Sequence, residues 1–221
     1  KKQFFKNMNH YVPPSDRELQ FKNVYLACMN KTAAAKEEKQ FVKEEMDRLK
    51  GIKTNQEMMD FSTARIGEGY TTFSMFRPVP NKENPLRYDA LVAAGLKTLP
   101  ERSYYENKDV TQDFRKILVD FFKLVKADQP EQRADWVLAF ETDYAMKTPL
   151  PREMRGRMSE KRDISRKDLL AKYPHLGIPE MLKKIPENTQ FVDIVPEANA
   201  FMNTAATTLP VEQLKSVYMF H

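Results

Sequence analysis

The sequence contains few of the residues from which enzyme sites are most often built. Its 221 residues include one cysteine, three histidines, one tryptophan and six glycines. A single thiol excludes an intramolecular disulfide framework and a cysteine-based zinc site. Cys28 stands at helical spacing with Phe21, Val24 and Tyr25, so we predict a buried structural thiol. A catalytic cysteine would need a nearby histidine, which the sequence alone does not place.

The three histidines form no metal-binding pattern. His10, His175 and His221 each lack a second histidine or a glutamate at the spacing that brings two ligands together on a helix. His175, in "YPHLG", is interpreted as a loop residue rather than a base. The sequence also lacks a Gly-x-Ser-x-Gly elbow, a phosphate-binding glycine loop and a calcium loop. On these grounds we assign no catalytic, cofactor-binding or metal-binding residue to this chain.

Long apolar runs are absent as well. No stretch of about 18 apolar residues occurs, so nothing in the chain is predicted to span a membrane. The composition, 41% hydrophobic and 30% charged, is typical of a soluble globular protein, and the length suits one domain or one domain with a lobe. The chain opens "KKQFF" without a methionine, so its first residue is not expected to be the native start, and export stays undecided.

Positive charge is concentrated in one segment. The formal net charge is +5, and residues 152–172 hold eight basic residues against four acidic ones. A nucleic-acid-binding surface more often shows a basic stripe with interleaved aromatic residues, or a recognised module, and this segment has neither. We therefore predict a solvated basic loop. Nucleic-acid binding, which would appear as strongly salt-dependent association, ranks last among the functions considered.

Most of the chain carries helix signals. Capping boxes at Ser15–Glu18 and Thr54–Glu57 begin two helices, and Gly51 is expected to end the helix between them in a left-handed conformation. The most regular apolar stripe follows a cap predicted at Asp109–Gln112; its members are Val110, Phe114, Ile117, Leu118, Phe121 and Val125. Further helices are predicted around residues 21–29, 36–51, 54–66, 136–144, 166–173, 178–185, 196–206 and 211–221.

A small β element interrupts the helices. Aromatic and β-branched residues are dense from Tyr70 to Arg77, turn residues follow in "NKENP", and a second extended run covers Arg87–Ala94. We predict an antiparallel hairpin at about 70–94 and a short strand in "TQFVDIV", residues 189–195. The predicted fold class is mainly α: a multi-helix domain with a small antiparallel β-hairpin.

The stretch "LKTLPERSYYENKD", residues 96–109, forms a corner between regular segments. Gly95 lets the chain leave the strand, and Pro100 sets φ for a helical turn. Tyr104 and Tyr105 offer large rings with polar tips, suited to packing on a sheet edge while their hydroxyls are hydrogen-bonded. The corner is interpreted as structural and supplies no catalytic residue.

Several fragments, in this order, resemble the neprilysin-type zinc metallopeptidases. The most specific is "GLKTLPERSYYE", which is similar to that family's Gly-Leu-x-Leu-Pro-x-Arg-x-Tyr-Tyr corner after a hairpin strand. Further fragments resemble the family's Tyr-x-x-Cys-Met-Asx helix, its next helix–loop–helix step, its Leu-Glu-x-x-Leu-Ala helix and the segment before the catalytic lobe: "FKNVYLACMNKTAA", "LKGIKTNQEMMDF", "LAFETDYAM" and "LPVEQLKSVYMF". The similarity runs from about Phe21 to His221. Ser103 departs from the usual aspartate, and Lys97–Thr98 stand where one residue is usual.

The resemblance implies that residues 1–221 are the N-terminal helical lid domain of a larger two-lobed metallopeptidase, truncated at both ends. In that family a His-Glu-x-x-His helix and a downstream glutamate of the C-terminal lobe hold zinc, and the motif glutamate is the general base in peptide hydrolysis. The lid encloses a chamber that admits peptides but not folded proteins. Zinc is therefore expected only in the absent catalytic domain, and the implied partners are that domain and peptide substrates. The family's substrate-touching lid residues precede the first matched helix, so none is carried over.

Two functions stay open. A lid domain, inactive alone, predicts an exposed apolar surface near the last helix, where the missing lobe would dock. A self-contained helical interaction module without enzymatic activity predicts a native stop near His221 and a monomer with no large exposed apolar patch. By analogy with the family, and because Cys28 has no disulfide partner, the expected location is that of an exported or periplasmic bacterial protein, or one anchored through a missing N-terminal segment.

Overall fold

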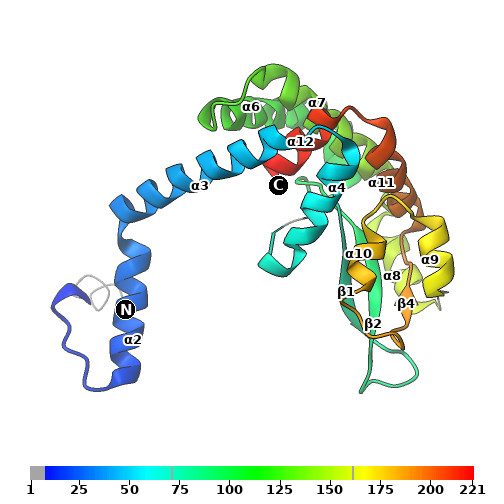
Figure 1. Ribbon diagram of the computed structural model, residues 1–221, viewed down its shortest axis with the longest axis horizontal. Coiled ribbons are helices and arrows are strands. Elements are labelled where there is room, and N and C mark those ends of the chain that lie inside the picture. The colour runs from blue at the N-terminus through cyan, green and yellow to red at the C-terminus, as the bar shows by residue number, and fades with distance from the viewer. Residues whose placement is uncertain (1–7, 71, 161) are drawn as a thin grey trace. The chain divides into compact units, whose positions relative to one another are not determined.

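The computed structural model describes residues 8–70, 72–160 and 162–221, and the chain forms two compact units, one ending at Gly51 and one covering Ile52–His221. Helices make up most of both units, and a small sheet belongs to the second (Figure 1). The predicted fold class, mainly α with an antiparallel hairpin, is confirmed.

The first unit contains a short 3-10 helix η1 (Met8–His10) and the helices α2 (Asp16–Met29) and α3 (Lys31–Gly51). The Ser15 hydroxyl accepts from the Glu18 backbone N–H at 3.4 Å, as the capping signal predicted. The left-handed conformation predicted for Gly51 is wrong. Gly51 is the last residue of α3, and the positive-φ glycines of the described chain are Gly69 and Gly177.

The apolar face predicted for α2 exists, but it is not buried. Phe21, Val24 and Met29 are 50%, 63% and 54% exposed, and none of the helix residues is buried. Cys28 is exposed too, so the predicted buried thiol is wrong. In α3 Phe41 is likewise exposed. Helical spacing shows which side chains share a face, but it does not show that another element covers that face.

The second unit begins with α4 (Asn55–Ala64), where the full capping box predicted at Thr54–Glu57 is present. A 3-10 helix η2 (Arg65–Glu68) follows, and Gly69 ends it with φ of 84°. The remaining helices are α5 (Arg102–Glu106), α6 (Lys108–Leu124), α7 (Pro130–Lys147), α8 (Pro151–Ser159), α9 (Arg166–Lys172), α10 (Ile178–Leu182), α11 (Pro196–Thr208) and α12 (Val211–Phe220).

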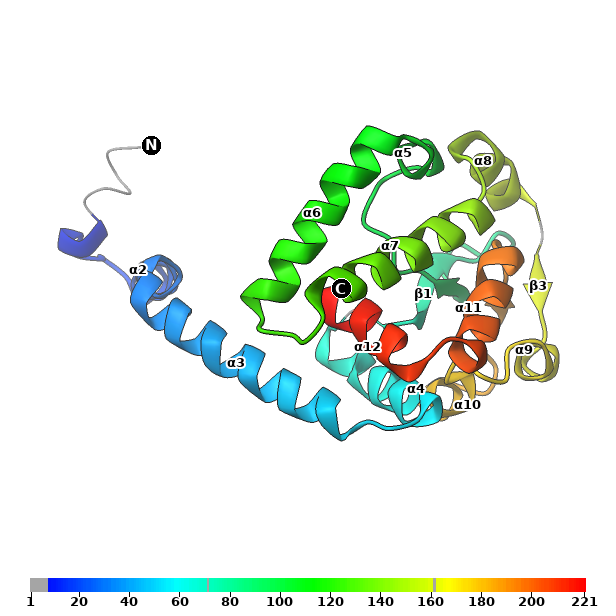
Figure 2. The ribbon, with the colours of Figure 1, turned by 90° about the horizontal axis from the view of Figure 1, so that it is seen from above.

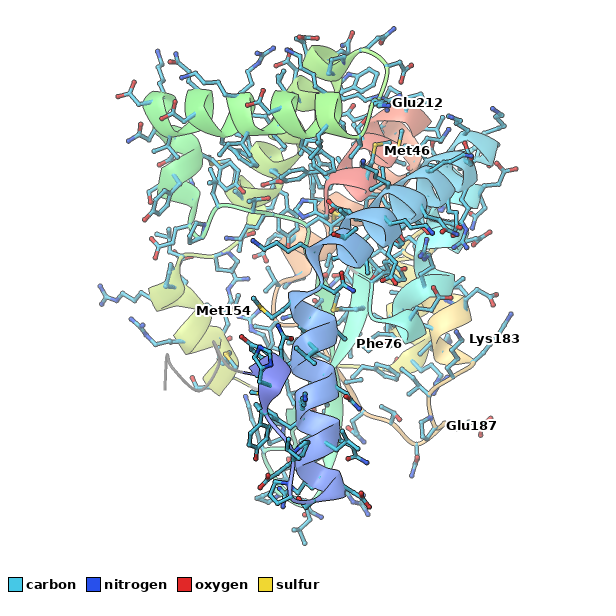
Figure 3. The ribbon with its side chains drawn as sticks, turned by 90° about the vertical axis from the view of Figure 1, so that its left-hand side faces the viewer. Met46, Phe76, Met154, Lys183, Glu187 and Glu212 are labelled. Carbon is cyan, nitrogen blue, oxygen red and sulfur yellow. The ribbon has the colours of Figure 1, made fainter. Side chains whose placement is uncertain are left out.

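The sheet has four strands in the order β1-β2-β4-β3. The predicted hairpin is present as β1 (Ser74–Pro80) paired antiparallel with β2 (Tyr88–Ala94), although β1 starts later than expected. The predicted strand near residue 191 is β4 (Phe191–Val192), which lies parallel to β2, and β3 (Asp163–Ile164) pairs antiparallel with β4. Phe76 on β1, labelled in Figure 3, has its ring centroid 5.3 Å from that of Phe191 on β4. This contact links β1 and β4, which lie on either side of β2.

Helix α7 is the centre of the second unit's core. It packs against α6, α11 and α12, and Figure 2 shows it running between α6 and the last two helices. Its inward side chains include Val137 and Phe140, which are fully or nearly fully buried. The Arg133 guanidinium donates to Ser216 at 2.8 Å and to Glu212 at 3.1 Å, which fixes the start of α7 to α12.

The stripe predicted for α6 is only partly buried. Phe114 and Leu118 are buried as expected, but Ile117 is 60% exposed. The buried face continues through Val119 and Phe122 instead. The prediction treated all apolar side chains of this helix as one stripe, whereas the helix has an inner apolar face and an adjoining outer one.

The basic segment is not the loop that was predicted, because it contains α8 and β3 in addition to α9, which matches the helix predicted around residues 166–173. Much of its charge is paired within the chain. Arg157 forms two hydrogen bonds, of 2.7 and 2.9 Å, to the carboxylate of Glu197, and Lys172 lies 2.9 Å from Asp193. Arg166 donates to backbone carbonyls, including that of Pro186 at 2.9 Å. Lys161 lies outside the described residues.

Candidate functional site

The corner begins where β2 ends, in close contact with α7. The Tyr144 hydroxyl donates to the carbonyl of Ala94, and a Cβ atom added to Gly95 would lie 3.3 Å from that hydroxyl. Gly95 does not have a positive φ. The glycine therefore marks the end of the strand, as expected. Its φ does not require glycine, but a side chain there would press on the Tyr144 hydroxyl of α7.

A buried carboxylate of α7 holds the corner in place. Glu141 is 0% exposed. Its Oε2 accepts from the Thr98 backbone N–H at 2.7 Å and from the Tyr105 hydroxyl at 2.5 Å, and its Oε1 accepts from the Thr98 hydroxyl at 2.9 Å. His221 Nε2 lies 3.0 Å from Oε1 and forms an ion pair with it when the imidazole is protonated. These partners satisfy a charge that would otherwise be costly to bury.

The two adjacent tyrosines have different environments. Tyr105 is 5% exposed, and its oxygen accepts from the Leu99 N–H at 2.9 Å while donating to Glu141. Tyr104 is 43% exposed. The prediction that both rings pack on a sheet edge is wrong, because α5, which carries them, packs against α6 and α7.

The end of the corner is capped by Asn107. Its Oδ1 accepts from the backbone N–H groups of Asp109 and Val110, at 3.0 and 3.3 Å, and α6 begins at Lys108. The cap predicted at Asp109 was therefore placed too late. Asparagine caps helices as well as aspartate does, and Asn107 comes first along the chain.

A second polar cluster holds the other side of the end of β2. Asn199, on α11, accepts from the Ala94 N–H at 2.9 Å and donates to Asp193 at 2.8 Å. The second carboxylate oxygen of Asp193 accepts from the Tyr173 hydroxyl at 2.6 Å and from Lys172 at 2.9 Å. Together with Glu141, this cluster ties β2, the corner, α7, α9 and α11 to one another.

Burial changes the pKa of the tyrosine hydroxyls in and beside these clusters. Burial, and then the hydrogen bond to Glu141, raises the pKa of Tyr105 well above its usual range, and burial with Asp193 does the same for Tyr173. Burial raises the pKa of Tyr144 to about 12. These hydroxyls are therefore donors rather than bases. Burial also lowers the pKa of Lys97, although Glu141 and Glu101 oppose this effect. Such clusters fix a fold, because every carboxylate oxygen is engaged.

The three histidines lie in different surroundings. His175 is exposed, and its backbone N–H donates to Asn203 at 2.8 Å. His10 is exposed in the first unit, and His221 faces Glu141. Within residues 8–70, 72–160 and 162–221, no group of three or more His, Cys, Asp or Glu side chains could hold a metal ion. The described residues thus do not fit a zinc site.

At least two open cavities lie in the described part of the second unit. One, of about 620 Å³, lies between the turn of the hairpin and the strands β3 and β4, and its lining includes Lys82, Asp89 and Arg162. The other, of about 590 Å³, lies at the start of α4 and includes Lys53 and His175. We assign no chemistry to either cavity.

Sequence reasoning missed Glu141, the residue on which the corner depends. A signal was present. Glu141 falls in phase with the buried positions Val137, Phe140 and Tyr144 of α7, so a charged side chain interrupts an otherwise apolar face. A carboxylate at such a position must find buried donors. The sequence does not show that Thr98 and Tyr105 supply them.

The fragment with the most specific sequence resemblance thus meets another of the matched fragments in space. Tyr105 of "GLKTLPERSYYE" bonds Glu141 of "LAFETDYAM", and Tyr144 of the second fragment packs against Gly95 of the first. A family model described as "Peptidase family M13" matches residues 2–221, essentially the whole chain. The chain belongs to peptidase family M13. The part of the family that it matches is the N-terminal domain of these neprilysin-like peptidases.

Solved structures of M13 proteins share the fold. The zinc metalloprotease Zmp1 of Mycobacterium tuberculosis in its open state matches with a TM-score of 0.80 at 14% identity, over 99% of this chain and 35% of that one. The inhibitor complex of Zmp1 matches with a TM-score of 0.68 at 15% identity, over 82% of this chain and 29% of that one. PepO of Lactobacillus rhamnosis matches with a TM-score of 0.66 at 11% identity, over 82% and 30%.

These comparisons show how much of a longer M13 protein the chain corresponds to. The chain spans about a third of the length of the solved proteins that it resembles. Identities of 11–15% establish the shared fold. No curated protein matches the sequence. Of the helices described in this M13 chain, none combines the length and the apolar composition that a membrane crossing requires.

Proposed function

We propose that the 221 residues form the substrate-enclosing N-terminal domain of a longer zinc-dependent endopeptidase that hydrolyses peptides. The match of the M13 family model to residues 2–221 is the observation that carries this proposal. The solved relatives with this fold include zinc metalloproteases about three times as long as this chain. The domain encloses substrate, and the metal and the acid–base groups belong to the rest of the enzyme.

This division of labour agrees with the chemistry of the described residues. Among their buried carboxylates, Glu141 and Asp193 are fully engaged by donors from neighbouring elements. A zinc hydrolase instead needs neutral histidine ligands, a carboxylate ligand and an open coordination position for water. We place these groups, in a His-Glu-x-x-His helix and a downstream glutamate, in the polypeptide that follows residue 221.

The reading frame of the gene tests the proposal. We expect it to continue past the codon for His221 and to encode His-Glu-x-x-His downstream. In the full-length protein, replacing the glutamate of that motif with glutamine should abolish hydrolysis while zinc stays bound, because the general base is lost and the ligands are not. A termination codon directly after His221 would contradict the proposal.

Enclosure has a consequence of its own. If the domain forms one wall of a closed chamber, the full-length enzyme should cleave short peptides but leave the same sequence uncut when it is displayed in a folded protein. Equal cleavage of both substrates would show that the domain does not enclose the site. Comparing the two substrates at one enzyme concentration, with the peptide sequence held constant, separates size exclusion from sequence preference.

The alternative is a self-contained helical interaction module. It would be favoured by a stop codon after residue 221 together with a stable monomer.

The proposal includes the location of the full-length protein. We expect that protein to be exported, which fractionation of the native cells would test. A protein found only in the cytoplasm would contradict that part and leave the enzymatic assignment in place.

A further inference from the structure

The outer side of α6 carries an apolar surface that the core does not use. Ile117 and Leu124 are 60% and 75% exposed, and Phe121 is half-buried between them. At 100° per residue, these three positions fall within an arc of about 60° on the helix. Phe220, in the last turn of α12, is half-buried and lies against Phe121 with 5.2 Å between ring centroids. We call Ile117, Phe121, Leu124 and Phe220 the α6 patch.

Two lysines of α6 near the α6 patch are paired within the unit. Lys116 lies 2.8 Å from Asp113, and Lys123 lies 3.3 Å from Glu131 on α7. Isolated exposed leucines are common on protein surfaces, but a contiguous apolar stripe with a polar border is typical of a contact surface.

The position of Phe220 indicates what covers the patch. Its ring belongs both to the patch and to the last turn of α12, and it also contacts Phe114 of the α6 inner face at 5.9 Å. Under the proposed function, on which this inference rests, the polypeptide continues beyond residue 221. That continuation leaves α12 beside the α6 patch. The match leaves about two thirds of the length of each solved relative uncovered.

We infer that the α6 patch is the docking surface for the polypeptide that follows α12 in the full-length peptidase. An apolar segment from that region packs over Ile117 and Leu124 and extends the aromatic contact between Phe121 and Phe220. Docking removes the largest exposed apolar side chains of α6 from water and holds the domain to the rest of the enzyme.

Thiol labelling of the full-length protein tests this inference. In a background with Cys28→Ser and any other cysteines replaced, single Ile117→Cys and Leu124→Cys variants place a small thiol on the patch. Leu86→Cys is the matched control, because Leu86 is 92% exposed in the hairpin turn, outside the patch. If the patch is covered, a maleimide should label both patch cysteines about tenfold or more slowly than the control.

The outcomes are distinct. Equal labelling rates at all three positions would overturn the inference. Protection that grows with protein concentration would assign the patch to a second copy of the chain and overturn it as well. Peptide hydrolysis by the same samples reports separately on the proposed function: slow labelling without zinc-dependent hydrolysis removes the peptidase assignment alone, and hydrolysis with rapid labelling removes the docking surface alone.

Discussion

At the scale of single residues, Glu141 is the side chain whose replacement should most clearly lower the free energy of unfolding. Replacing it with glutamine keeps its size but places an amide group among donors, so the bonds from Thr98 and Tyr105 are weakened. We expect Glu141→Gln to lower the free energy of unfolding by about 2 kcal/mol. Urea denaturation of the variant and the parent chain measures this change.

Glu106→Gln is the matched control for that measurement. Glu106 is exposed and pairs with Arg102 across one turn of α5, at 3.0 Å. Exposed pairs of this kind contribute little, so this variant should lie within about 0.5 kcal/mol of the parent chain. If the two variants were equally stable, Glu141 would not be holding the corner.

The raised pKa of Tyr144 predicts that the chain loses stability at alkaline pH. Burial raises its pKa from 10.0 to about 12 in the folded chain. Between those values the unfolded chain has lost the proton that the folded chain keeps. The folded state therefore binds more protons, and stability falls as pH rises through this window. Tyr105 and Tyr173 add losses of the same sign.

The Tyr144→Phe variant isolates the contribution of Tyr144 to this loss of stability. This variant should lose stability less steeply than the parent chain between about pH 10 and pH 12, although it is less stable at neutral pH, because the bond to Ala94 is gone. Unfolding midpoints measured across that range decide the point. Parallel curves for the two proteins would mean that the Tyr144 hydroxyl titrates normally.

At the scale of elements, two glycines should respond to alanine in opposite directions. Gly177 precedes α10 with φ of 67°, and a Cβ atom there would overlap the side chain of Thr63 on α4. Gly156 lies inside α8 with open space around it. We expect Gly177→Ala to cost at least about 2 kcal/mol and Gly156→Ala to stabilise by about 0.5–1 kcal/mol.

Thermal unfolding of the two glycine variants measures both effects. Each serves as the control for the other, since the chemical change is the same. A similar shift in both would show that the approach of α10 to α4 is loose enough to accept a side chain.

Local chemistry explains why the elements were largely predictable. The capping box at Thr54–Glu57 and the prolines that open α11 and α12 act over one turn, so the sequence shows them directly. Coverage is a different matter. Phe21 of α2 and Ile117 of α6 are as apolar as the buried residues of α7, and only tertiary packing decides which faces are covered. The basic segment was misjudged for the same reason, because Glu197 lies far along the chain from Arg157.

At the scale of the whole molecule, two helices present apolar faces that are not buried. No side chain of α2 is buried, and the α6 patch leaves a second apolar face exposed. The sequence prediction of an exposed apolar surface near the last helix has a counterpart in this patch, because Phe220 of α12 is one of its members. Under the proposed function, faces of this kind are those that the rest of the enzyme would cover.

Zinc-dependent hydrolysis is the measurement that tests the central claim most directly. The full-length protein and the 221-residue chain are each given zinc and the same short peptide, and product is followed with and without a chelator. We predict hydrolysis by the full-length protein that the chelator abolishes, and no zinc-dependent hydrolysis by the 221-residue chain. Zinc-dependent cleavage by the 221 residues alone would contradict the account, because it would place the active site within them.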